Sequence, residues 1–155
     1  MTEAIREGDI PGVQLRRRQA LALSPEEAWR WLVEPALLAR WLADEVEVEL
    51  GARGGLRLAG QEGGAGVAAR RERGTTVEYA PPHLWVLAFE RLDAGWGAAT
   101  RLALAVHPHA EGAELDVLQG GFQRLPLSLC LTAWESYRRR WREALERLAR
   151  ESATP

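Results

Sequence analysis

The sequence contains almost no cysteine, the residue that forms disulfides and thiolate metal clusters. Its 155 residues include one cysteine, Cys130, which excludes an internal disulfide and a thiolate metal cluster. Cys130 falls in an apolar stretch, so a buried, inert thiol is favoured over a nucleophile. The fold must therefore be stabilised by a hydrophobic core, and a single domain of this length buries enough surface to form one.

Lysine and asparagine are also absent, so all 20 basic residues are arginine. Scarce asparagine, cysteine and methionine are typical of a heat-adapted protein, and a GC-rich genome would give the same bias. The formal net charge of −2 argues against nonspecific nucleic-acid binding. Residues 1–12 contain no apolar run. We therefore expect a loose lead-in there, no signal peptide, no membrane span and a cytoplasmic location.

What is present favours one α+β domain over residues 13–151. The clearest periodic segment runs from Pro126 to about Glu151. Apolar side chains recur there at intervals of three or four, which predicts one stripe of a helix roughly seven turns long. The stripe consists of Trp134, Tyr137, Trp141, Leu145 and Leu148. A helix with this face needs a broad apolar surface to pack against.

Two shorter helices are predicted between residues 24 and 42. Ser24 can cap the first helix, Pro25 suits its first position, and Glu27 completes a capping box. We expect this helix to stop before Pro35, which disfavours a helical residue ahead of it and opens the second helix. Neither helix is long enough to be stable alone, so both must dock on the rest of the domain.

The remaining segments are predicted to be antiparallel strands. The predicted strands cover residues 13–23, 45–50, 56–58, 67–72, 74–79, 84–92, 100–106 and 115–119. In the first strand three successive arginines disturb the alternation, which a bulge or an edge position would accommodate. The second alternates strictly, so Val46 and Val48 face the core and its glutamates face water rather than a metal.

The connections between these strands are predicted from glycine, proline and polar residues. We expect a flexible hairpin over residues 60–66, which lacks the ending of a phosphate-binding loop. Turns are expected at residues 93–98, with Trp96 exposed, and at residues 107–112. Residues 84–92 are apolar on both faces, so periodicity does not determine which face meets the core.

Five short motifs, in this order, resemble the AHSA-type branch (heat-shock ATPase activator homologues) of the SRPBCC superfamily, also called START-related or Bet v 1-like. They are residues 24–29 (SPEEAW), 35–42 (PALLARWL), 54–57 (GGLR), 74–84 (GTTVEYAPPHL) and 141–148 (WREALERL). The resemblance spans roughly residues 13–150. It implies a helix-grip fold, in which a curved antiparallel sheet of about six to seven strands wraps round the long C-terminal helix and encloses a cavity.

The resemblance leaves the function open. Many family members hold hydrophobic small molecules such as lipids in the cavity, some catalyse cyclisation or hydrolysis, and others bind a chaperone, so the fold alone does not settle function. This chain also departs from the family pattern. Arg140 stands where a glycine precedes Trp141, and Ala88 stands where an aromatic residue is common.

The favoured hypothesis is binding of a small hydrophobic or aromatic ligand between the sheet and the C-terminal helix, without a cofactor. Apolar pockets with a few polar groups are the usual form of such sites. The hydroxyls of Tyr79 and Tyr137 would orient the ligand. The predicted lining consists of Trp41, Val48, Tyr79, Trp85, Leu104, Phe122, Trp134, Tyr137 and Trp141.

A protein-interaction module, either a chaperone partner or a homodimer, is the first alternative. It would present an exposed apolar patch formed by Trp85, Leu87, Phe89 and Trp96. A polyketide cyclase-like enzyme is the second alternative.

The enzyme hypothesis needs a general acid or base inside the pocket. Glu90, Asp116 or a tyrosine could serve, although outward-facing carboxylates are favoured. No nucleophile, base and orienting acid can be recognised together, so no catalytic residue is assigned. His107 and His109 lack a third metal ligand, and surface histidines are favoured. The arginines of residues 70–73 favour a solvated strand end over an anion site.

Overall fold

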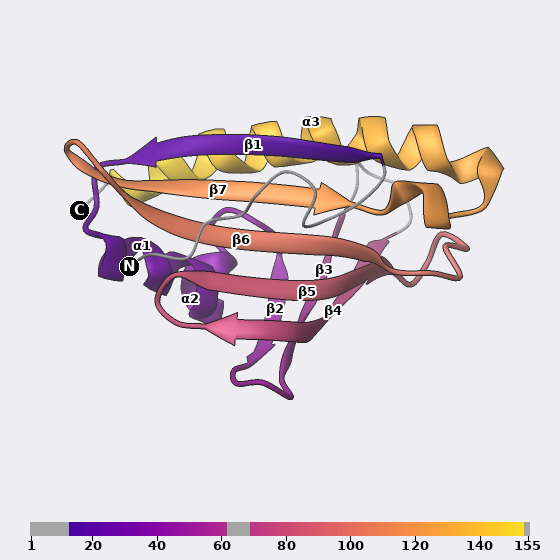
Figure 1. The fold of residues 1–155 in the computed structure, drawn as a ribbon, viewed down its shortest axis with the longest axis horizontal. Coiled ribbons are helices and arrows are strands. Elements are labelled where there is room, and N and C mark those ends of the chain that lie inside the picture. The colour runs from indigo at the N-terminus through magenta and orange to yellow at the C-terminus, as the bar shows by residue number, and fades with distance from the viewer. Residues whose placement is uncertain (1–12, 62–68, 154–155) are drawn as a thin grey trace.

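The computed structural model describes residues 13–61 and 69–153, and it confirms the predicted α+β helix-grip architecture (Figure 1). Seven strands form one antiparallel sheet: β1 (Gln14–Leu21), β2 (Glu45–Glu49), β3 (Gly55–Gln61), β4 (Ala69–Ala80), β5 (Leu84–Arg91), β6 (Thr100–His109) and β7 (Gly112–Gly120). The helices are α1 (Pro25–Val33), α2 (Pro35–Leu38), the 3₁₀-helix η1 (Phe122–Arg124) and α3 (Leu127–Ser152).

The sheet is a meander to which the first strand is added at one end. Its order is β1-β7-β6-β5-β4-β3-β2, so β1 is an edge strand, as its three arginines suggested. Figure 1 shows α3 lying along β1 and β7 while β2, β3 and β4 turn away from them. The curvature therefore leaves α3 with one side against the sheet and another side facing the inner edges of β3 and β4.

Both short helices begin where the sequence predicted and α1 ends before Pro35, but α2 ends at Leu38, earlier than predicted, and residues 39–42 form a turn. The Ser24 side chain accepts a hydrogen bond from the Glu27 amide at 3.1 Å, and the Glu27 carboxylate accepts one from the Ser24 amide at 3.3 Å. This capping box satisfies two amides that the helix itself leaves unpaired. The helix α1 ends at Val33, and Pro35 begins α2.

The core lies between the concave face of the sheet and the apolar stripe of α3. Four of the five predicted stripe residues are buried, with Trp141 1% exposed, and Trp134 is half-buried. The Trp141 indole donates to the Gln119 side chain at 2.8 Å, and Gln119 donates to the Thr100 hydroxyl at 3.0 Å. These buried contacts join the middle of α3 to β6 and β7.

The structure fixes the orientation of β5 and corrects one prediction. Trp85, Leu87 and Phe89 face the core, all 1% exposed or less. Trp96 was predicted to be exposed, which is wrong, because it is 4% exposed. Its ring packs against Tyr137 with the centroids 5.5 Å apart. The four residues of the predicted interaction patch are therefore all interior.

Several strand boundaries also differ from the prediction, including the start of β7 at Gly112 and the end of β3 at Gln61. Residues 69–80 form the single strand β4, because Gly74 pairs in register with Phe89 rather than starting a new strand. A Cβ atom at Gly74 would lie 3.0 Å from Leu87, so the close approach of that side chain accounts for the glycine. The strand β6 continues to His109, which shortens the predicted turn. Most of the predicted hairpin at residues 60–66 lies outside the described residues.

Candidate ligand-binding site

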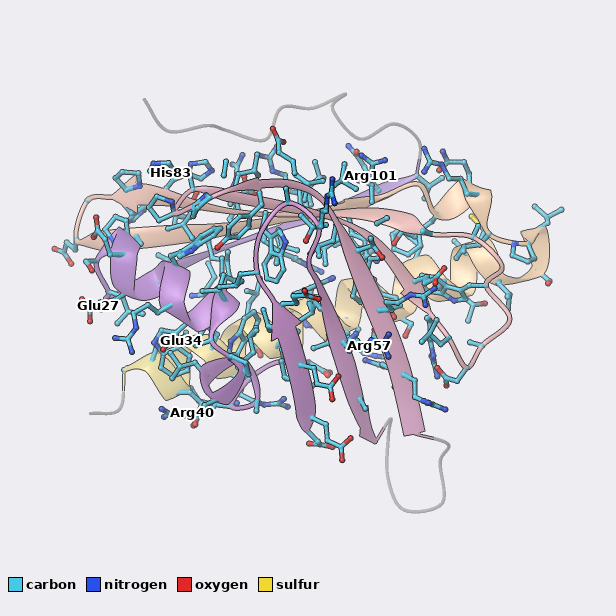
Figure 2. The ribbon with its side chains drawn as sticks, turned by 90° about the horizontal axis from the view of Figure 1, so that it is seen from below. Glu27, Glu34, Arg40, Arg57, His83 and Arg101 are labelled. Atoms are coloured by element: carbon cyan, nitrogen blue, oxygen red, sulfur yellow. The ribbon has the colours of Figure 1, made fainter. Side chains whose placement is uncertain are left out.

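A hollow of about 670 Å³ lies between α3 and the inner edges of β3 and β4. The segment that leaves α2 closes one end of it. Its lining is formed by Ala39, Arg40, Trp41, Leu42, Ala43, Asp44, Gly60, Arg70, Glu72, Ser136, Arg139, Arg140, Glu143, Ala144 and Arg147. In Figure 2, β2, β3 and β4 pass in front of α3.

The lining of this first hollow is rich in cationic side chains. Five arginines stand against three carboxylates, those of Asp44, Glu72 and Glu143. Arg40 lies beside the C-terminal end of α3 (Figure 2), where its Nε donates to the Glu151 carboxylate at 3.2 Å. Arginine forks bind carboxylates and other planar anions well, so the first hollow is suited to an anionic group.

A second hollow of about 370 Å³ continues along the same helix. Ser136 and Arg139 line both hollows, so the two form one trough, here named the α3 trough. The second hollow is lined by Arg91, Ala94, Trp96, Leu129, Thr132, Ala133, Glu135, Ser136, Tyr137 and Arg139. Small apolar and aromatic side chains are more frequent here than in the first hollow.

A buried polar cluster occupies the wall of the first hollow. Glu72 is 2% exposed, and its Oε2 accepts hydrogen bonds from the Tyr137 hydroxyl and from the Arg140 guanidinium. Burial raises the pKa of Tyr137 well above 10, and the charge of Glu72 adds to that rise. The hydroxyl is therefore protonated and acts as a donor. Burial opposes the charge of Arg140, but the Glu72 carboxylate outweighs it and raises the pKa of Arg140.

The other oxygen of Glu72 has no hydrogen bond. Its Oε1 is buried, and no donor reaches it in the structure. A buried acceptor without a partner costs free energy of folding, so such groups are uncommon and often functional. Because Glu72 lines the first hollow, this acceptor lies at the trough wall.

The structure does not gather the nine predicted lining residues around one hollow. Trp41 lines the first hollow and Tyr137 lines the second. Core residues that are 1% exposed or less account for four others: Trp85, Leu104, Phe122 and Trp141. Three are half-buried and line neither hollow: Val48, Tyr79 and Trp134. The aromatic stripe of α3 thus fills the core more than it borders open space.

The charged residues of the trough were missed by sequence reasoning. Glu72 lies between the exposed Arg71 and Arg73, so it looked like part of a solvated strand end. The strand pairing explains why Glu72 points inward. Glu72 is opposite Leu58, a buried residue of β3, and residues paired across two strands share a face of the sheet. The outward arginines of this segment are exposed as predicted, whereas Arg70 lines the trough.

The two carboxylates considered for catalysis lie in neither hollow. Asp116 is 1% exposed and pairs with Arg16, whose Nη2 lies 2.6 Å from Oδ2. It alternates along β7 with the core residues Leu115 and Val117, so it belongs to the opposite face. Glu90 forms an ion pair with Arg73 across the β4–β5 pairing.

The other residues considered as metal ligands or nucleophiles lie outside both hollows. The glutamates of β2 are exposed, and His107 Nε2 lies 3.7 Å from the Asp116 carboxylate. Cys130 is a free thiol and half-buried, not fully buried as expected. Over the residues that the structure describes, no cluster of three or more potential metal ligands occurs. No helix of this part of the chain is long and apolar enough to cross a membrane.

A sheet curled round one long helix, with a trough between the two, defines the helix-grip class of the SRPBCC, or Bet v 1-like, superfamily. Within that class, residues 22–151 match the family model described as activator of Hsp90 ATPase homolog 1-like protein, and the chain belongs to this family. No curated protein matches the chain.

Solved structures with the same fold are available from several bacteria. Protein CV1439 from Chromobacterium violaceum is 23% identical with a TM-score of 0.73, over 92% of this chain and 98% of that one. A protein from Rhodobacter sphaeroides is 22% identical with a TM-score of 0.71, over 94% and 95%. CalU16 from Micromonospora echinospora is 17% identical with a TM-score of 0.63, over 88% and 70%. At this level of identity the likeness shows the fold alone.

Proposed function

We propose that this chain binds a small hydrophobic or aromatic molecule that carries an anionic group, in the α3 trough. Such a ligand would place its charged group in the first hollow and its apolar body against the second. The fold supports a binding role, because small-molecule sites are usually concave and largely pre-formed, as the α3 trough is.

The observation that carries the proposal is the change of lining along α3. The first hollow presents five arginines, and the second presents Ala94, Trp96, Leu129 and Ala133 among its walls. A charged surface next to an apolar surface is complementary to a molecule with a charged group at one end and an apolar body at the other. A purely apolar ligand would offer no charged group to the first hollow, whose five arginines outnumber its three carboxylates.

A pair of fluorescent dyes tests the proposal directly. The first dye, 8-anilino-1-naphthalenesulfonate, is aromatic and anionic, and N-phenyl-1-naphthylamine has the same rings without the sulfonate. We expect saturable binding of the sulfonate dye, and about fivefold weaker binding of the neutral one, since a charge-assisted contact contributes about 1 kcal/mol at a half-exposed site. Equal affinity for the two dyes would contradict an anion-binding trough.

Matched arginine variants locate the site. Arg139 lines both hollows, whereas Arg57 is an exposed residue of β3 that lines neither. Figure 2 shows Arg57 on the open strands β2 to β4. We expect Arg139→Gln to weaken binding of the sulfonate dye by about fivefold and Arg57→Gln to leave it unchanged. Equal losses in the two variants would indicate nonspecific attraction to arginine instead of binding in the trough.

A further inference from the structure

We infer that Oε1 of Glu72 accepts a hydrogen bond from a hydroxyl group of the ligand, which makes the ligand class a hydroxylated aromatic acid. The inference rests on the proposed function, because it concerns the same trough. It goes further by assigning a second recognition point, separate from the arginines that receive the anionic group.

The first support is that one oxygen of a fixed carboxylate accepts no hydrogen bond. The Tyr137 hydroxyl and the Arg140 guanidinium both donate to Oε2, which holds the Glu72 side chain in place. Neither bonds Oε1, which is buried without any partner. A carboxylate oxygen accepts up to two hydrogen bonds, so Oε2 is satisfied while Oε1 keeps its full capacity to accept.

The second support is the position of that oxygen. Glu72 is 2% exposed and yet belongs to the lining of the first hollow. The unpaired acceptor therefore belongs to a side chain of the trough wall, where a donor on a bound molecule would be its partner. A satisfied acceptor would recover the free energy that the unpaired oxygen costs.

The surroundings favour a neutral donor over a cationic one. An ammonium group could also bond a carboxylate, but the five arginines of the first hollow outnumber its three carboxylates, and this excess of positive charge disfavours a further cation. A hydroxyl carries no charge and is small enough to approach a buried atom. The same arginines attract a carboxylate on the ligand, so a molecule with both groups uses both parts of the wall.

Three aromatic acids separate the contributions. The probes are 4-hydroxybenzoate, benzoate and 4-methoxybenzoate, which share the ring and the carboxylate but differ in the group that meets Glu72. We expect the wild-type protein to bind 4-hydroxybenzoate about tenfold more tightly than the other two, measured by calorimetry, because a hydrogen bond to a charged acceptor is stronger than one between neutral groups. The methoxy compound controls for size, since its oxygen cannot donate.

A double variant provides the second test. Glu72→Leu with Arg140→Met removes the ion pair as a whole, because replacing one partner would leave the other as a buried unpaired charge. We expect this variant to fold, as judged by circular dichroism, and to bind the three acids with equal affinity. The single variant Arg139→Gln should weaken all three acids and keep the preference for the hydroxyl.

The outcomes distinguish the two proposals. If none of the acids binds, the proposed function of the trough is wrong. If all three bind the wild-type protein within twofold of one another, the trough binds anions and the role of Glu72 is wrong. If the double variant keeps the tenfold preference, the hydroxyl is recognised elsewhere and the inference is overturned. If the double variant does not fold, the comparison of the three acids on the wild-type protein decides the inference.

Discussion

At the scale of single residues, hydrogen bonds between residues distant in sequence pair the indole nitrogens of the interior. Four indole nitrogens have identified acceptors: Trp41 on the Trp31 carbonyl, Trp85 on Thr76, Trp134 on the Gln14 carbonyl and Trp141 on Gln119. Against this background Glu72 Oε1 is one of the few buried side-chain polar atoms without a hydrogen bond among the residues that the structure describes. It lies in the trough wall and not in the packed core, which is where a binding group is expected.

Tyr137 makes the stability of the protein depend on alkaline pH. Burial raises its folded pKa well above the value of about 10 that it has in the unfolded chain. Below pH 10 both states keep the proton, and the stabilisation is fully present. Above pH 10 the unfolded state loses the proton first, so stability is lost as the pH rises toward the folded pKa.

Urea unfolding between pH 9 and 11 measures this effect. We expect the free energy of unfolding of the wild-type protein to fall by on the order of 1 kcal/mol per pH unit in excess of the slope for Tyr137→Phe. The phenylalanine variant keeps the ring contacts with Phe89, Trp96 and Phe122 but has no proton to lose. Identical slopes for the two proteins would show that Tyr137 does not titrate differently in the folded state.

At the scale of elements, the helices differ in what specifies them. The short helix α1 depends on its ends, with a capping box at Ser24 and an Arg30–Glu34 pair at 2.6 Å near its C-terminus. The long helix α3 has no side-chain cap at Pro126 and depends on its faces. One face is buried in the core, and the neighbouring arginine-rich face lines the trough.

The cap of α1 gives a prediction at this scale. We expect Ser24→Ala to lower the free energy of unfolding by about 1 kcal/mol, because the Glu27 amide loses its side-chain acceptor, while the backbone amide of residue 24 is retained. Ser128→Ala is the matched control, since Ser128 is an exposed serine in the first turn of α3. Chemical denaturation of the two variants checks this. A loss of equal size in both would mean that the cap contributes nothing particular.

At the scale of the whole molecule, the sheet and α3 stabilise one another through a few large side chains. The chain of contacts from Trp141 through Gln119 and Thr100 to the Phe89 carbonyl crosses β7, β6 and β5. Because the contacts come from segments far apart in the sequence, α3 and the sheet are expected to unfold together. The α3 trough lies between the same helix and the same sheet, so its shape depends on the packing of Trp141 against the sheet.

Removing the Trp141 side chain, which connects α3 to the sheet, should destabilise the whole fold. Trp141 is 1% exposed, so we expect Trp141→Ala to lower the free energy of unfolding by about 3–5 kcal/mol. The half-buried Trp134 provides the comparison, and Trp134→Ala should cost clearly less. Thermal unfolding followed by circular dichroism measures both. If Trp141→Ala remained as stable as Trp134→Ala, the aromatic stripe would not be the main contact between helix and sheet.

Much of the architecture could be predicted because it depends on local patterns. The capping box, the prolines and the three- to four-residue spacing of α3 act within a few residues of each other. The errors arose where distant contacts decide the outcome. Trp96 looked like a turn residue, but Phe122 and Tyr137 cover it. The segment broken at Gly74 in the prediction is continuous because β3 and β5 pair with it on both sides.

The sequence by itself determined the order of strands and helices, the caps of α1 and the buried stripe of α3, since each follows from spacing along the chain. Only the tertiary structure decided which side chains line the trough and which of them are in contact. The Tyr137 hydroxyl meets a carboxylate 65 residues away, and the Arg140 guanidinium meets the same group across 68 residues. Such meetings depend on how far the sheet curves over the helix, and that curvature is a property of all seven strands together.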